Sequence, residues 1–249
     1  MKYSQTEEEV IIESLIQRYN DIPKTCIEVG ATDGLWLSNT AHLWKDLGWK
    51  AVLIEADDGN FVNLLRNTKD YLCMCYHKRI EPSGPDSIDE LVERGGYLFS
   101  GGPQSEIGIL SIDIDGDDYH IFEGLKMRPW IVLVEFNATI PPKVDIVSPV
   151  GSKLGCSAKA LGRLASSKDY VVWGISGSNI ILVRSDLIGQ PNLDILEYNL
   201  KAVISYFQDH SLSYLIQDYE GNWAVFREPV FGFRMPMKEQ GDQLWVPRM

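Results

Sequence analysis

The stretch TCIEVGATDG, residues 25–34, together with the later run AVLIEAD, residues 51–57, decides the fold of this chain. Each run contains a short apolar segment of strand length, and a glycine-containing turn follows the first of them. An amphipathic segment separates the two runs, and the apolar part of the second ends on Glu55. Strand, glycine turn, helix, strand and acid form the first unit of a nucleotide-binding α/β fold.

The chemistry of this unit predicts a cofactor site. Gly30 and Gly34 let the backbone turn tightly and approach a ligand, and the helix that follows directs its first N–H groups toward that ligand. The carboxylate of Glu55, at the tip of the second strand, can accept hydrogen bonds from both hydroxyls of a ribose. The alternative is a glycine turn with a purely structural role, or a former cofactor site that no longer binds its ligand. The Gly-x-Gly-x-x-Gly pattern of dinucleotide-binding proteins is absent, which disfavours NAD.

The remaining sequence repeats the alternation of strands and helices. Further apolar runs of strand length lie at residues 71–76, 107–114, 130–134, 170–173 and 179–184. The last two are separated by a glycine- and serine-rich turn, which indicates a hairpin. We therefore predict an α/β fold with a doubly wound, mostly parallel seven-stranded sheet that ends in a C-terminal hairpin strand.

The domain organisation is expected to be simple. Residues 1–249 form a single domain in this prediction, with its core at about 25–185. Residues 6–19 are predicted to form a leading helix, and residues 190–249 a C-terminal extension. That extension is predicted to contain a helix at 195–207, followed by irregular sequence.

Composition limits the partners. The formal net charge of −12 disfavours nucleic acid, because binding phosphate backbones requires clustered lysine and arginine. No apolar run approaches the roughly 20 residues of a membrane span, so no membrane is expected. The four cysteines show no disulfide framework, and no signal peptide is recognisable, so we expect a cytoplasmic protein. The sequence is compatible with a homo-oligomer.

Acidic and amide side chains gather where the predicted strands end. Asp113, Asp115, Asp117 and Asp118 follow the fourth strand, and Glu135 and Asn137 follow the fifth. Ligands of doubly wound sheets bind at these carboxyl ends. The aspartate run fails as an EF-hand, since its sixth and twelfth positions are not glycine and glutamate. It remains either an acidic helix N-terminus or part of a site for a hard cation.

Several of these motifs resemble one enzyme family. Glu28-Val29-Gly30-Ala31-Thr32-Asp33-Gly34 is similar to the first motif of class I S-adenosylmethionine-dependent methyltransferases, particularly the FkbM-type group. Leu53-Ile54-Glu55-Ala56, Ser87-Ile88-Asp89-Glu90-Leu91 and Leu110-Ser111-Ile112-Asp113 resemble later motifs of that group. The resemblance implies a Rossmann-like methyltransferase fold and the cofactor S-adenosyl-L-methionine. It also implies the following cofactor-binding residues: Glu28, Gly30, Ala31, Gly34, Glu55, Ala56 and Asp113.

A second resemblance concerns the aspartate run. Asp115-Gly116-Asp117-Asp118-Tyr119 is similar to the Asp-Gly-Asp-x-Tyr motif of TylF-type macrocin O-methyltransferases, which use a divalent metal. It implies a divalent metal, Mg²⁺ or Mn²⁺. Oxygen donors for it stand at two neighbouring strand ends: Asp115, or alternatively Asp113, together with Glu135 and Asn137. The catalytic residues would be Asp115, Asp118 and His120, the last two as bases. The chain departs from the family patterns at Thr32, where many relatives have glycine, and at Phe136, which separates the two ligands of the fifth strand.

The expected activity is methylation of a hydroxyl on a saccharide or a saccharide-bearing small molecule. The proline-containing loop at 138–155 is expected to act as a mobile lid and to form one wall of the acceptor pocket. Two alternatives remain: a non-catalytic α/β module that binds a nucleoside, and a nicotinamide-linked sugar-modifying enzyme.

Overall fold

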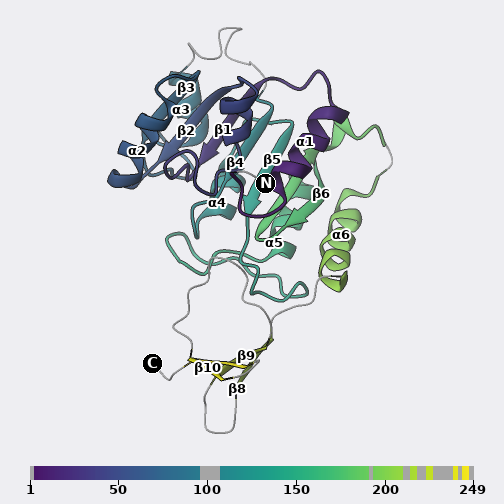
Figure 1. Ribbon diagram of the computed structural model, residues 1–249. Helices are drawn as coiled ribbons and strands as arrows, with labels where there is room; N and C mark the ends of the chain where they lie inside the picture. Colours follow the sequence, from purple (N-terminus) through teal and green to yellow (C-terminus); the bar gives the residue numbers. More distant parts are fainter. Residues whose placement is uncertain are drawn as a thin grey trace.

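The protein is described from a computed structural model (Figure 1). The structure describes residues 3–95, 107–190 and 193–209, together with four short strands in the C-terminal segment. The sequence SGGP at residues 100–103, which predicts a surface loop, lies outside the described residues.

Strands and helices alternate along the first two thirds of the chain. In order, the elements are α1 (Glu8–Arg18), β1 (Thr25–Val29), η1 (His42–Asp46), β2 (Lys50–Glu55), α2 (Asp58–Thr68), β3 (Cys73–His77), α3 (Ile88–Arg94), β4 (Ile109–Ile112), α4 (Asp118–Gly124), β5 (Ile131–Glu135), α5 (Ala158–Ser167), β6 (Tyr170–Ser176), β7 (Asn179–Arg184), η2 (Ser185–Leu187) and α6 (Ile195–Asp209). Four strands follow: β8 (Tyr214–Gln217), β9 (Trp223–Phe226), β10 (Lys238–Gln240) and β11 (Gln243–Val246).

The first seven strands form one sheet in the order β3-β2-β1-β4-β5-β7-β6. Strands β1 to β5 are parallel, whereas β7 pairs antiparallel with both β5 and β6. The predicted α/β fold, with a seven-stranded, mostly parallel sheet and a closing hairpin, is therefore confirmed. The strand order reverses between β1 and β4, which is where such sheets bind ligands.

Both faces of the sheet are buried, because successive side chains of each strand point to opposite sides. On one face, Ile27, Ile54 and Leu110 join a core cluster with side chains of α3, α4, α5 and α6. On the other face, Cys26 and Leu53 join a second cluster with α1, η1 and α2. Figure 1 shows the strands side by side with the helices packed around them. Burial on both faces explains why these strands have continuous apolar sequences.

The segment after the glycine turn differs from its prediction. From the sequence, Asn39 is expected to cap a helix running to about Leu47, but only the short π-helical turn η1 forms, and Leu47 is exposed. Ser38, Asn39 and Thr40 all hydrogen-bond to the buried carboxylate of Glu28. Residues 38–40 are therefore held by that carboxylate, and η1 begins after them, at His42.

The C-terminal segment also differs. Sequence beyond the last helix was expected to be irregular, whereas β8 to β11 form a four-stranded antiparallel sheet in the order β10-β11-β9-β8. These strands have only three or four residues each, so their period-two pattern is too short to recognise in a sequence. In the described part of the chain, no helix has the length and apolarity needed to cross a membrane.

One buried residue predicts a pH dependence of stability. His42 in η1 is 5% exposed, and neither ring nitrogen has a hydrogen-bond partner in the described structure. Burial lowers its pKa, although the nearby acids Glu9, Glu13 and Asp46 raise it. The unfolded chain therefore binds a proton more readily than the folded one. Above the ordinary histidine pKa of about 6.5, His42 is neutral in both the folded and the unfolded chain. Below that value the unfolded chain takes up a proton more readily, so the free energy of unfolding decreases as the pH falls.

We expect His42→Leu to flatten this slope of unfolding free energy between pH 7 and pH 5. Urea denaturation at a series of pH values measures it. The exposed His77 provides a matched control, since His77→Gln should retain the slope. An unchanged slope in His42→Leu would show that His42 is not the linked group.

Candidate functional site

A cavity of about 290 Å³ opens where β1, β2 and β4 end, at the reversal of strand order. Its walls come from five segments: the glycine turn (Val29, Gly30, Thr32), the tip of β2 (Ile54, Glu55, Ala56, Asn60), the residues after β3 (Lys78, Arg79, Ile80), the acidic loop after β4 (Asp113 to Asp117) and residues 151–153. The volume lies at the lower end of the range for small-molecule sites. Three sequence segments predicted to bind a ligand thus meet around one cavity.

Glu55 connects the β2 tip to the glycine turn. Its side chain is 8% exposed, and it lines the cavity. Its two oxygens accept hydrogen bonds from the backbone N–H groups of Thr32 (2.8 Å) and Asp57 (2.6 Å). Each carboxylate oxygen has a second lone pair, so the group can still accept two hydroxyl donors from a ligand. Ala56, also predicted as a cofactor contact, lines the cavity beside it.

Gly30 lies at the floor of the turn and lines the cavity as predicted. Its φ of +85° is in the left-handed region, and a Cβ there would meet the carbonyl oxygen of Asp113 at 1.8 Å. Glycine is therefore required both by the turn and by the close approach of the two loops.

Thr32, which sequence reasoning treated only as a departure from the family pattern, has a φ of +48° and lines the cavity. A strained residue of this kind often marks a functional turn. Its position where relatives carry glycine was the signal that could have identified it.

The structure places three predicted cofactor contacts away from the cavity. Glu28 is 3% exposed, and it accepts hydrogen bonds from the hydroxyls of Ser38 and Thr40 and from the N–H of Asn39. Burial raises its pKa, and these donors oppose that effect. We conclude that Glu28 organises the segment after the glycine turn from inside the protein.

Ala31 and Gly34 likewise have structural positions. Ala31 is fully buried in the core cluster shared with α1 and α2. A Cβ on Gly34 would meet Leu64 of α2 at 2.7 Å, so this glycine allows helix α2 to pack against the turn. Both residues shape the turn, and neither lines the cavity.

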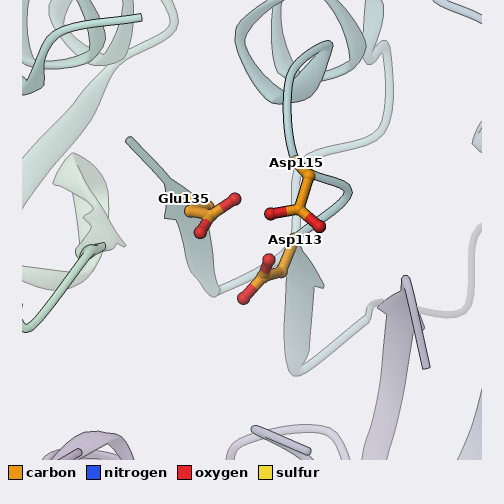
Figure 2. A group of neighbouring side chains, drawn as sticks. All are labelled: Asp113, Asp115 and Glu135. Atoms are coloured by element: carbon orange, nitrogen blue, oxygen red, sulfur yellow. The ribbon is translucent and has the colours of Figure 1, made fainter. Parts of the chain in front are cut away.

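Three carboxylates converge at the ends of β4 and β5 (Figure 2). Asp113, Asp115 and Glu135 each offer an oxygen within 4.8 Å of the others, and we call them the acid triad. Figure 2 shows the three carboxylates pointing toward one another. Asp115 is the most exposed of them, has a left-handed φ of +57°, and lines both the main cavity and a smaller one beside Glu135.

The acid triad is electrostatically strained. Burial raises the pKa of Asp113, and the neighbouring carboxylates of Asp118 and Asp115 raise it further. Burial and the charge of Asp113 likewise raise the pKa of Glu135. Oxygens of the two carboxyl groups lie within 4.8 Å of each other, and two carboxylates this close repel, so one proton on the pair is favoured. A cation bound here would satisfy the same oxygens without that proton.

Asn137, also predicted as a ligand, lines the smaller cavity together with Asp115 and Glu135. Its Oδ1 accepts hydrogen bonds from the N–H (3.0 Å) and the hydroxyl (2.6 Å) of Thr139, and its Nδ2 donates to the carbonyl of Leu154. Asp113, the alternative ligand to Asp115, joins Asp115 and Glu135 in the group of three acids. The part of Asn137 in a metal site stays a prediction.

The two predicted bases also have other partners. Asp118 accepts hydrogen bonds from the N–H groups of Ile114 (2.8 Å) and Gly116 (2.9 Å), and so closes the acidic loop. Burial raises its pKa to about 6, although these donors lower it. His120 lies 2.8 Å from the carbonyl of Ser148 through Nε2 and lines neither cavity near the triad. Asp118 borders the smaller cavity, whereas His120 anchors the following loop.

The loop predicted as a lid contains a short hairpin, residues 146–157. A bridge pairs Val147 with Cys156, and the N–H of Ser148 donates to the carbonyl of Gly155 (3.0 Å). The hairpin is tied to the acidic loop, since Asp117 accepts a hydrogen bond from the N–H of Gly151 at 2.6 Å.

Residues of this hairpin form one side of both cavities. Its position as a wall therefore agrees with the expectation, and its mobility stays a prediction.

Three cations at the cavity were missed by sequence reasoning. Lys78 and Arg79 directly follow β3, and Lys153 comes from the hairpin. Lys78 pairs with Asp86 at 3.1 Å and Arg79 with Asp117 at 3.3 Å. The rule that ligands meet strand carboxyl ends, applied to the third strand as it was to the others, would have identified the first two.

No family model matches the chain, and no curated protein sequence matches it. Solved structures do show similarity. A SAM-dependent methyltransferase from Aquifex aeolicus has 10% sequence identity and a TM-score of 0.40, over 71% of this chain and 89% of that one. An O-methyltransferase family protein from Burkholderia thailandensis has 11% identity and a TM-score of 0.40, over 70% and 55% of the two chains. The CMeT domain of a citrinin polyketide synthase has 13% identity and a TM-score of 0.43, over 71% and 51%.

Proposed function

We propose that this protein is an S-adenosylmethionine-dependent O-methyltransferase assisted by a divalent cation. The observation that carries the proposal is the joint position of Glu55 and two members of the acid triad, Asp113 and Asp115, on one cavity at the reversal of strand order. A nucleoside-binding carboxylate and a cluster suited to a hard cation serve different purposes. Their presence in one site favours catalysis over binding alone.

The residues fit the nucleoside part of the cofactor. Backbone N–H groups of Thr32 and Asp57 fix the carboxylate of Glu55 in the cavity, and its remaining lone pairs suit two ribose hydroxyls. The glycine turn borders the same cavity, and the close approach at Gly30 leaves its backbone accessible to the ligand. When bound, S-adenosylmethionine supplies an electrophilic methyl group on sulfur.

The residues also fit a cation. Asp113, Asp115 and Glu135 would hold Mg²⁺ or Mn²⁺ through three oxygens, the ligand type that these ions prefer. A cation there lowers the pKa of a bound hydroxyl, which makes an alcohol a better nucleophile. Asp115 is exposed to both cavities, so its carboxylate is well placed to orient an acceptor hydroxyl. Asp118 remains the candidate for receiving its proton, since it borders the smaller cavity.

The acceptor proposed on the family resemblance is a hydroxyl of a saccharide or a saccharide-bearing molecule. The polar lining of the smaller cavity, with Asp115, Asp118, Glu135 and Lys153, suits a polar acceptor near the acid triad.

Isothermal titration of the full chain with S-adenosylmethionine, S-adenosylhomocysteine and NAD tests the cofactor. We expect micromolar binding of the first two, as is usual for substrates and cofactors at working concentrations, and no measurable binding of NAD. Binding of NAD alone would favour the nicotinamide-linked enzyme. Binding of the methyl donor without turnover on any hydroxyl acceptor would favour the non-catalytic nucleoside module.

A further inference from the structure

The hairpin 146–157 exposes more apolar surface than its own packing explains. Four large apolar side chains in and next to it are exposed: Val144 (40%), Ile146 (39%), Val150 (58%) and Leu154 (47%). We call them the apolar ridge. Single exposed apolar residues are ordinary, but several in one short segment indicate a surface that meets another molecule. The opposite side of the hairpin is buried, with Ser148 and Cys156 facing the core.

The same segment is basic in a strongly acidic chain. Residues 143–159 contain Lys143, Lys153 and Lys159 and a single acid, Asp145, whereas the whole chain has a net charge of −12. Asp145 is already paired with Arg163 at 3.2 Å. The ammonium group of Lys153 contacts the carbonyl of Asp115 at 3.2 Å and forms no ion pair with any carboxylate in the described part of the chain. Residues 143–159 therefore have a net charge of +2, from three lysines and one aspartate, and this local charge favours an anionic group on the ridge. Lys153 also lines the smaller cavity with the acids Asp115, Asp118 and Glu135.

One end of the ridge borders the candidate active site. Leu154 of the ridge and its neighbour Lys153 line the smaller cavity together with Asp115 and Glu135 of the acid triad. The hairpin is held in this position by two contacts from the acidic loop and the α4 region, namely Asp117 to Gly151 and His120 to Ser148. A molecule that contacts Leu154 would therefore lie next to the acid triad.

We propose that the acceptor is an anionic amphiphile. Its apolar body lies along the ridge, its anionic group meets Lys153, and its hydroxyl end enters the cavity beside Asp115. This inference rests on the proposed function and specifies its substrate class. A saccharide acceptor fits it when the sugar is the head of such an amphiphile. The continuity with the acid triad favours an acceptor over a second copy of the chain, which would have no need of that end of the ridge.

Dodecyl phosphate, kept below its micelle concentration, is the probe that tests this proposal. We expect calorimetric binding of dodecyl phosphate to the full chain, and at least tenfold weaker binding of both inorganic phosphate and uncharged dodecyl maltoside. The double variant Val150→Ser/Leu154→Ser should weaken the binding of dodecyl phosphate at least about tenfold, because two apolar contacts with its alkyl chain are removed. The control Val62→Ser/Leu65→Ser changes two equally exposed residues on α2, at 47% and 48%, and should have no effect.

Lys153→Met separates the two parts of the interaction. It should weaken the binding of dodecyl phosphate about ten- to a hundredfold and leave the affinity for dodecyl maltoside unchanged, because only the charge-assisted contact is lost. Circular dichroism checks that each variant is folded. Equal affinity of the wild type and the ridge variant, or equal weakening in the α2 control, would overturn the proposal. So would ultracentrifugation that shows a dimer dispersed by Val150→Ser/Leu154→Ser, because a second copy would then cover the ridge.

The same samples are titrated with S-adenosylmethionine. Binding of the methyl donor without binding of dodecyl phosphate would overturn only the substrate class. Absence of both would overturn the proposed function itself.

Discussion

Treatment with EDTA is expected to lower methyl transfer at least about a hundredfold, and added Mg²⁺ or Mn²⁺ is expected to restore it. The reason is the acid triad, in which burial and neighbouring carboxylates raise the pKa of both Asp113 and Glu135. A cation relieves this repulsion and activates the acceptor hydroxyl at the same point. Affinity for S-adenosylmethionine should survive chelation, because Glu55 and the glycine turn belong to other strands.

Asp115→Asn should reproduce the chelated state in the presence of metal. It removes one charged oxygen ligand from the triad, so Mn²⁺ binding measured by calorimetry should weaken about ten- to a hundredfold. Asp70→Asn, at an exposed position of the α2–β3 connection, serves as the control and should bind Mn²⁺ like the wild type. Full turnover in EDTA would contradict the metal assignment and leave the triad as an acid–base group.

Glu55→Ala is expected to weaken S-adenosylmethionine binding about ten- to a hundredfold. The loss of hydrogen bonds between a carboxylate and the ribose costs about 1.5–3 kcal/mol, which corresponds to that change in affinity. The substitution also removes the acceptor for the N–H of Thr32, which donates a hydrogen bond to Glu55 at 2.8 Å. Part of the lost affinity will therefore come from a change in the glycine turn.

Glu55→Gln distinguishes these contributions. Its amide oxygen can still accept one backbone hydrogen bond, so the turn is retained while the charge is lost. We expect an affinity between those of the wild type and Glu55→Ala, measured by titration on folded protein. Glu93→Ala, at an exposed position of α3, controls for the loss of one negative charge. Unchanged affinity in a folded Glu55→Ala variant would exclude this residue as the ribose ligand.

The positions of the strands could be predicted from the sequence because strands buried on both faces require apolar runs. The runs at Cys26–Val29, Ala51–Ile54 and Ile131–Val134 have no other stable location in water. Once the strands are known, the parallel topology places their carboxyl ends together, so the general place of the site follows as well. Gly30, Glu55 and Asp115 were identified in this way, and all three line the cavity.

Side-chain direction at those strand ends was decided only by the tertiary structure. Glu28 points inward because three hydroxyl and N–H donors, brought by the segment 38–40, surround it there. Asp113 and Asp115 both lie beside Glu135, with a left-handed turn at Asp115, while Asn137 accepts a hydrogen bond from Thr139. Contacts between residues far apart in the chain set these directions.

The hairpin illustrates the same limit. Its lysines and apolar residues can be read from the sequence. The hydrogen bond from the N–H of Gly151 to Asp117, however, joins residues 34 positions apart. A sequence pattern reports the period of local structure and the burial of each face. The sequence alone therefore determined which strands carry the site. Packing of the whole chain decided which loops meet when they are far apart in the sequence. It thereby also decided which residues face one another in the site.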